Sequence, residues 1–499
     1  MTTIQTKSKK QGTMNIVAKS TLVIILLLGL CSSLFAQAPD RSKVPEPGPT
    51  PTLTLPPIQH FALSNGLAVV LMEKHELPLV QMNLLVKTGS VLNPADKPGL
   101  ASLTADMMDE GAGSRNALEL SDAINFLGAD IYVSAGSHTS GVSLHTPLSK
   151  LDQALELYAD IILRPTFPAE ELERKKKERL TSLMQQHDEA RSIASVLYNR
   201  TLFGSKHPYG IPDIGNEKSL RSMKVEDLKK FYTQYFQPAN AAIIVVGDIS
   251  KDALQQKLEK LFAGWKADKA AEVKLPSASQ VDGRTIYLVD KPGAAQSVIR
   301  IGRIGAARTT EDYYAIQVMN TILGGSFSSR LNQNLRETHG YTYGASSAFS
   351  FRPTPGPFTA ASDVQTNVSD SALFEFMKEL KNIANVTDDD VSRAKNYLAL
   401  GYPSDFSTIG SIAGMLSDLT FYNLPDDYFN HYVQNVLALT KEDIQRVANK
   451  YIDADNLAII IVGDRAKIEK GIKALNVGKI KNLSIDDVLG KAPKLDETK

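Results

Sequence analysis

The chain has 499 residues and carries 55 Lys plus Arg against 55 Asp plus Glu, so its formal net charge is zero. A single hydrophobic core rarely grows beyond about 250 to 300 residues, so a chain of this length is expected to form two or more domains. The even charge balance gives no support to nucleic acid or an acidic polymer as a partner. Composition therefore points to a multidomain globular protein.

The first 38 residues have the three parts of a secretory signal peptide. The basic start is formed by Lys7, Lys9, Lys10 and Lys19. An apolar run over residues 21–30 follows, and Ala36-Gln37-Ala38 offers a cleavage site of small residues. The apolar run is far shorter than the roughly 20 residues that a membrane span needs. We expect export to the periplasm, as a free or a membrane-associated protein.

Cys31 is the only cysteine, so cleavage after residue 38 leaves a mature chain without thiols. Leu30 precedes it where a lipobox has Gly, Ala or Ser, and lipidation of Cys31 stays open as the alternative to cleavage. Residues 39–57 are rich in proline and predict an extended leader that acts as a tether or an arm.

A segment near the middle of the chain returns near its end without a gap. Residues 225–248, "VEDLKKFYTQYFQPANAAIIVVGD", and residues 441–464, "KEDIQRVANKYIDADNLAIIIVGD", are 216 positions apart. Each copy predicts a helix, a short polar turn and a buried strand rich in β-branched residues. Two homologous domains are the simplest source of such a repeat.

Apolar segments ahead of each copy extend the repeat. Residues 63–90 and residues 284–305 each predict a hairpin of two strands that opens a domain, with helices and further strands between hairpin and closing strand. We therefore predict an α+β fold of two homologous domains, each a mostly antiparallel sheet layered with helices. The predicted domains are residues 58–272 and 273–485.

Residues 99–111, "GLASLTADMMDEG", predict an amphipathic helix. Its apolar face consists of Leu100, Leu103 and Met107. Ser102, Ala105 and Asp106 are expected to share a different face. One carboxylate and one hydroxyl offer a transition metal neither imidazole nor enough charge, and no two of the eight histidines have the helical spacing of zinc ligands. We expect this chain to hold no metal.

The duplication and three further motifs resemble the insulinase/pitrilysin family of metallopeptidases. The motifs are "KTGSVLNPADKPGLA" at 87–101, "KHPYG" at 206–210 and "LGGSFSSRLNQNLRETHGYTYG" at 323–344. The likeness is strongest to the shorter bacterial members related to mitochondrial processing peptidase, and it covers nearly all of the mature chain. It implies a duplicated, processing-peptidase-like fold.

Active members of that family bind zinc through H-x-x-E-H on a helix, where the two His hold the metal and the Glu polarises a water. The resemblance places Ser102 at the first His, Ala105 at the Glu and Asp106 at the second His. A further Glu ligand on a later helix corresponds to the Thr181-Ser182 pair or its close neighbours. The resemblance therefore implies a degenerate zinc site and no peptidase activity by this chain alone.

A second part of the family's site looks intact. In short bacterial members, an Arg and a Tyr seven residues apart reach the active site of the opposing domain and stabilise the oxyanion. Arg336 and Tyr343 match that pair. The structural alternative is that Arg336 pairs with Glu337 and that Tyr343 packs within a strand beginning near Tyr341.

Residues 132–144, "YVSAGSHTSGVSL", alternate in polarity and are rich in small residues. They resemble the edge strand with which the family takes up an extended peptide by strand addition. An ordinary strand is the alternative.

The resemblance implies a non-catalytic, substrate-orienting subunit of an exported heterodimeric zinc metalloendopeptidase. A homologous partner with H-x-x-E-H would supply the zinc and the general base, and this chain would supply Arg336 and Tyr343. The substrates would be peptides or unfolded segments. The alternative is a catalytically dead structural or peptide-binding protein. An autonomous hydrolase is disfavoured, because no His, Cys or carboxylate cluster has metal or nucleophile spacing.

Overall fold

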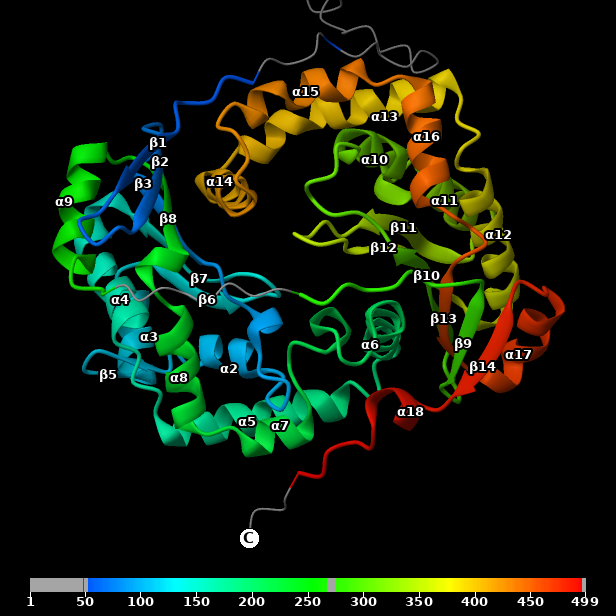
Figure 1. Cartoon of the computed structure of the whole chain (residues 1–499), viewed down its shortest axis with the longest axis horizontal. Coiled ribbons are helices and arrows are strands. Elements are labelled where there is room, and N and C mark those ends of the chain that lie inside the picture. Colours follow the sequence, from blue (N-terminus) through cyan, green and yellow to red (C-terminus); the bar gives the residue numbers. More distant parts are fainter. Residues whose placement is uncertain (1–47, 49–52, 267–274, 496–499) are drawn as a thin grey trace, which may run out of the picture. The chain divides into compact units, whose positions relative to one another are not determined.

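The computed structural model describes residue 48 and residues 53–266 and 275–495. The predicted signal peptide and the predicted boundary at residues 272 and 273 lie outside this part of the chain. No helix among the described residues is both long and apolar enough to cross a membrane. The described residues form two six-stranded sheets and the helices that cover them (Figure 1).

The first sheet belongs to the first half of the chain. Its strands, in spatial order, are β1 (Gln59–Ala62), β2 (Ala68–Glu73), β8 (Ala241–Gly247), β3 (Leu79–Val86), β7 (Ser140–Pro147) and β6 (Asp130–Ala135). Only the β2 and β8 pair is parallel. The two-residue strands β4 (Gly111–Ala112) and β5 (Arg115–Asn116) form a separate ladder.

The second sheet repeats this order for five of its six strands, and its sixth strand, β14, comes from the end of the second half, whereas β1 comes from the start of the first half. Its strands are β11 (Thr342–Phe349), β12 (Pro357–Gln365), β10 (Gln296–Ile304), β13 (Ala458–Gly463), β9 (Thr285–Asp290) and β14 (Lys479–Leu483). β9 pairs in parallel with β13 and with β14, and the other neighbours are antiparallel. The predicted fold, two mostly antiparallel sheets layered with helices, is confirmed.

The two predicted opening hairpins are wrong. β8 lies between β2 and β3, and β13 lies between β9 and β10. β8 and β13 consist almost wholly of buried apolar residues. A strand that is buried on both faces belongs in the interior of a sheet, with a neighbour on each side. Each closing strand of the repeat therefore separates the two strands that begin its half.

The helices follow the same order in both halves. Those of the first half are α2 (Leu100–Asp106), α3 (Ala117–Phe126), α4 (Leu151–Leu163), α5 (Ala169–Gln185), α6 (Ala190–Phe203), α7 (Glu217–Ser222), α8 (Val225–Tyr235) and α9 (Lys251–Phe262). Those of the second half are α10 (Tyr313–Asn320), α11 (Arg330–Asn332), α12 (Ser369–Asn382), α13 (Asp388–Gly401), α14 (Ile409–Tyr422), α15 (Tyr428–Ala438), α16 (Lys441–Tyr451), α17 (Arg465–Ala474) and α18 (Ile485–Leu489). Two π-helical turns, η5 (Thr321–Gly325) and η6 (Gln333–Thr338), flank α11.

Helix α6 of the first half covers the sheet of the second half (Figure 1). Ile193 and Leu197 of α6 belong to one buried cluster with Ile460 and Val462 of β13. The hydroxyl of Tyr198 donates to the backbone carbonyl of Phe358 in the second sheet. Apolar burial of this kind stabilises the contact between the two halves.

Helix α14 of the second half covers the first sheet in the same way (Figure 1). Ile412 and Leu416 of α14 share a buried cluster with Ile244 and Val246 of β8. Since α6 and α14 occupy equivalent places in the repeat, the two halves have exchanged equivalent helices. Each sheet is thus covered by helices from both halves.

Both ends of the described chain pack on the other half of the repeat. Leu53 and Leu55, at the end of the predicted leader, pack against the apolar core of the second half, while residues 39–47 and 49–52 of that leader lie outside the described residues. Beyond residue 485, where the second domain was predicted to end, buried Val488 joins the α6 cluster and Leu495 packs on the core of the first half. Arg200 of α6 donates to the Val488 carbonyl at 2.7 Å.

Candidate functional site

Helix α2 carries the positions that correspond to the zinc motif of the resembled family. Leu103 and Met107 are fully buried in the core of the first half, as the apolar pattern predicts. Ala105 is also buried, at 1% exposure. Residues three apart on a helix point only about 60° apart, so Ala105 lies on the same side of α2 as Ser102 and is nevertheless covered by the protein.

Arg179 of α5 lies between Ser102 and Asp106. Its Nη1 donates to the Ser102 hydroxyl at 3.0 Å, and its Nη2 donates to the Asp106 carboxylate at 2.6 Å. The Ser102 hydroxyl in turn donates to the backbone carbonyl of Asp213 at 2.6 Å. The Arg179 side chain is only 11% exposed. A protein cation therefore occupies the space between the two positions that would carry zinc-binding histidines.

Thr181 and Ser182 also lie on α5, but they do not join this cluster. The Thr181 hydroxyl donates to the carbonyl of Lys177 at 2.9 Å, and the Ser182 hydroxyl donates to the carbonyl of Glu178 at 3.1 Å. Hydroxyls that bond to their own helix in this way have little left to offer another group. α5 contributes Arg179 to the cluster, a residue that the sequence reasoning missed.

The donor set around α2 does not fit zinc. A hydroxyl, one carboxylate and a guanidinium provide no imidazole or thiolate, and the guanidinium repels a second cation. Within the described ranges, no group of three or more His, Cys, Asp or Glu side chains is placed to hold a metal ion.

Further ion pairs tie the turn after α2 to α5. Glu110 lies 2.5 Å from both the Arg174 guanidinium and the Lys175 ammonium. These two cations lower the pKa of the Glu110 carboxyl despite its partial burial. Next to it, burial raises the pKa of Asp109. The α2–α5 contact thus consists of protein charges of opposite sign.

Arg336 lies in the π-helical turn η6 of the second half. Its Nε is 3.5 Å from a carboxylate oxygen of Glu337, so the pairing that the sequence left open is present. Both side chains are more than a third exposed, and such surface pairs contribute little to stability. The guanidinium carbon also lies 4.5 Å from the ring centre of Phe327.

Tyr343 projects into solvent. It is 92% exposed, more than any other large apolar or aromatic side chain among the described residues, so the alternative that it packs within its strand is wrong. The ladder between β11 and β12 shifts register between Thr342 and Ala345. The Thr342 hydroxyl accepts from the Gly344 backbone N–H at 3.1 Å. A bulge of this kind turns a side chain away from the sheet.

The segment 132–144 contains two strands. β6 lies at the edge of the first sheet and pairs only with β7. The equivalent edge strand of the second half, β11, is partly covered: Asn320 Nδ2 donates to the Ser347 carbonyl at 3.0 Å, and Asn332 Oδ1 accepts from the Ala345 N–H at 3.2 Å. At β6 the Tyr132 carbonyl accepts from the Ser143 hydroxyl of the paired strand β7 at 3.4 Å, and α2 packs close to β6.

The "KHPYG" motif joins the two halves. The Tyr209 hydroxyl lies 2.8 Å from Thr354 Oγ1 and 2.5 Å from His138 Nε2. Arg352 stacks over the Tyr209 ring at 4.2 Å. Burial, and the nearby Arg352 charge, lower the pKa of His138 to about 4. This motif therefore has a structural role in the fold.

Two family models match the sequence. Residues 68–207 match the insulinase model of peptidase family M16, and residues 222–398 match the model of the peptidase M16 inactive domain. Together the two models cover more than half of the chain.

Relatives include proteins named as peptidases and one named as a non-peptidase. Zinc protease PqqE of Helicobacter pylori is 25% identical over 80% of this chain and 90% of its own length. Non-peptidase homolog YmxG of the same species is 21% identical over 80% of this chain and 92% of its own length. The uncharacterized zinc protease YmxG of Bacillus subtilis is 26% identical over 60% of this chain and 72% of its own length.

Solved structures share the fold. A peptidase M16 inactive domain from Pseudomonas fluorescens has a TM-score of 0.76 and 27% identity, covering 81% of this chain and 98% of its own. A protease from Helicobacter pylori has a TM-score of 0.75 and 22% identity, covering 82% of this chain and all of its own.

Proposed function

Because the chain belongs to the insulinase (M16) peptidase family as a peptidase-like member without the zinc motif, we propose that it is the substrate-orienting subunit of a heterodimeric zinc metalloendopeptidase. Its partner is a homologous chain that carries H-x-x-E-H. The complex cleaves peptides or unfolded segments, and this chain alone is inactive. The basic and apolar N-terminus and the small-residue cleavage site support export to the periplasm.

One contrast within the chain carries this proposal. The positions that would hold zinc are occupied by Ser102 and Asp106, with Arg179 between them. Arg336 is instead partly exposed, with 36% of its side chain accessible, and Tyr343 is 92% exposed. An aromatic ring in that position adds nothing to the core, so its use is best explained by a ligand outside this chain.

The chemistry of the exposed pair fits an oxyanion. The Arg336 guanidinium has five N–H donors and remains charged at all physiological pH values, and the Tyr343 phenol is a further donor. Donors that are fixed in advance stabilise the negative charge that develops on a carbonyl oxygen during attack by water. Zinc and the partner's Glu would activate that water. β6 is an edge strand of the first sheet, the kind of position at which an extended peptide can pair.

The test is reconstitution with the H-x-x-E-H chain encoded in the same genome. We expect this chain alone to be free of zinc and inert, and the co-expressed pair to cleave a quenched fluorescent peptide. Arg336→Ala and Tyr343→Phe should each lower kcat by about 10² to 10³, the usual cost of one oxyanion donor. Ser102→Ala is the control and should leave kcat unchanged. Normal kcat in both variants would remove the basis of the proposal.

A second candidate is a peptide-binding or structural protein without any peptidase partner. The similarity to a protein named as a non-peptidase homolog favours it. In that case peptide binding, measured by fluorescence anisotropy with this chain alone, would survive replacement of both Arg336 and Tyr343.

A further inference from the structure

Phe327 is an exposed aromatic ring beside Arg336. It is 63% exposed, and its ring centre lies 4.5 Å from the guanidinium carbon of Arg336. A cation over a ring face at this distance is attracted by the ring quadrupole. The ring therefore holds the guanidinium on one side and leaves much of its own surface in water.

The segment that carries Phe327 is fixed to β11. Asn332 is buried, at 4% exposure. Its Nδ2 donates to the Phe327 carbonyl at 2.7 Å, and its Oδ1 accepts from the Ala345 N–H at 3.2 Å. Ala345 is two residues after Tyr343. One buried amide thus links the backbone at Phe327 to the strand that presents Tyr343.

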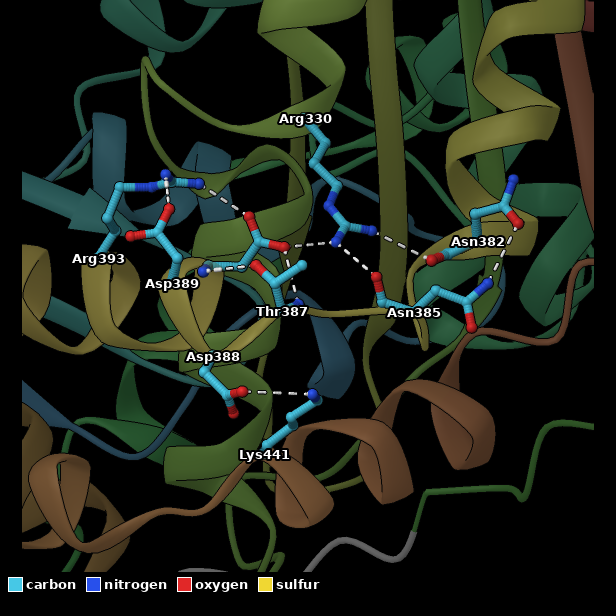
Figure 2. Close-up of polar contacts among 9 residues, drawn as sticks. Arg330, Asn382, Asn385, Thr387, Asp388, Asp389, Arg393 and Lys441 are labelled. Carbon is cyan, nitrogen blue, oxygen red and sulfur yellow. Dashed lines mark hydrogen bonds and ion pairs between the residues drawn. The ribbon is translucent and has the colours of Figure 1, made fainter.

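The same segment is fixed on its other side by Arg330 (Figure 2). The Arg330 guanidinium donates to the carbonyls of Asn382 and Asn385 at 3.1 and 2.8 Å, and to the Asp390 carboxylate at 2.7 Å. These acceptors lie at the end of α12 and the start of α13. Phe327 is therefore an exposed residue on a segment that hydrogen bonds fix in place, three residues before Arg330.

We propose that Phe327 forms an apolar subsite that binds a substrate side chain next to the scissile bond. The inference rests on the proposed function, in which Arg336 and Tyr343 meet the substrate carbonyl. Residues of an extended peptide advance by about 3.3 Å each, so a side chain adjacent to that carbonyl comes within reach of a ring 4.5 Å from Arg336. The preferred substrates are peptides with Leu, Met, Phe or Tyr at that position.

The experiment compares two quenched fluorescent peptides in the reconstituted complex. The peptides are identical except that one has Leu and the other Gln next to the cleaved bond. Phe327→Ala should lower kcat/KM for the Leu peptide about tenfold, within the range for a lost apolar contact, and change it little for the Gln peptide. Phe327→Tyr should restore the preference for Leu.

The control is Phe374→Ala. Phe374 lies on α12 and is 54% exposed, so it is another exposed phenylalanine of the second half. This variant should keep the wild-type preference. The subsite would be overturned if the Phe327→Ala complex retained the preference for the Leu peptide, or if its kcat/KM fell equally for both peptides.

The two proposals fail in different ways. If Arg336→Ala lowers kcat for both peptides while Phe327→Ala behaves as wild type, only the subsite is wrong. If Arg336→Ala and Tyr343→Phe are also without effect, the proposed function itself is wrong. Circular dichroism of each variant checks that the fold is retained.

Discussion

The guanidinium of Arg179 on α5 lies 2.6 Å from the carboxylate of Asp106 on α2, although the two residues are 73 positions apart in the sequence. Ser102 accepts from the same guanidinium at 3.0 Å. In this family a metal ion joins the corresponding helices of active members. Here the Arg179 side chain places a positive charge between α2 and α5.

Loss of this contact should destabilise the fold. We expect Arg179→Met to lower the free energy of unfolding by about 1 to 2 kcal/mol, less than for a fully buried pair because Asp106 is partly exposed. Lys177→Met, an exposed position on the same helix, is the control. Urea denaturation followed by circular dichroism measures both, and equal midpoints for the two variants would show that the Arg179 contacts contribute nothing.

Arg179 should also prevent a restored zinc site from loading. In a Ser102→His, Asp106→His, Ser182→Glu variant, we expect no stoichiometric zinc while Arg179 remains, since its charge and its volume occupy the site. Adding Arg179→Ala should permit binding. Metal analysis by mass spectrometry after gel filtration gives the answer, and one zinc per chain in the variant that keeps Arg179 would contradict the prediction.

His138 should make stability depend on pH. Its pKa is about 4 in the folded chain, below the 6.5 of an ordinary histidine, because it is buried beside Arg352 and Tyr209. The unfolded chain therefore binds the proton first as pH falls. This contribution to stability is complete above about pH 6.5 and is lost progressively towards pH 4.

Substitution of this histidine tests the effect. We expect His138→Gln to remove about 1 to 2 kcal/mol of the stability change between pH 7 and pH 5, a discounted value for a partly accessible group. His431→Gln, at an exposed histidine on α15, is the control. Thermal melts at the two pH values would refute the prediction if His138→Gln and wild type lost the same stability.

The exchanged helices α6 and α14 should make the two halves unfold together. We expect a single calorimetric transition for residues 53–495, with equal calorimetric and van't Hoff enthalpies. Tyr198→Phe, which removes the hydroxyl bonded to the Phe358 carbonyl, should cost about 1 kcal/mol and leave the transition single. Two separated transitions in the wild-type chain would show that the halves are independent.

The duplicated α+β fold could be predicted from sequence because the repeated segment shows a helix and a buried strand in each copy. The position of β8 between β2 and β3 could not, since strand order depends on how buried faces pair across the whole half. Helical periodicity placed Leu103 and Met107 in the core, but it did not show that Ala105, on another side of the helix, is buried as well.

The residues that were missed depend on distant contacts. Arg179 lies in a basic run of α5, where nothing in the run distinguishes it from its neighbours, and only packing against α2 gives it a role. Phe327 appears in the sequence as one more apolar residue after a glycine turn. Its exposure follows from anchors at Arg330 and Asn332, whose partners come from α12, α13 and β11.

The exchange of α6 and α14 gives one polypeptide the arrangement that two separate chains adopt in a domain-swapped dimer. If the chain were cut between residues 266 and 275, each half would still have a helix packed on the other half's sheet. Each half on its own would expose the apolar faces of both its sheet and its donated helix. Each half of the repeat therefore needs a second half to cover its apolar surfaces. Because both halves belong to one chain, their pairing does not depend on protein concentration.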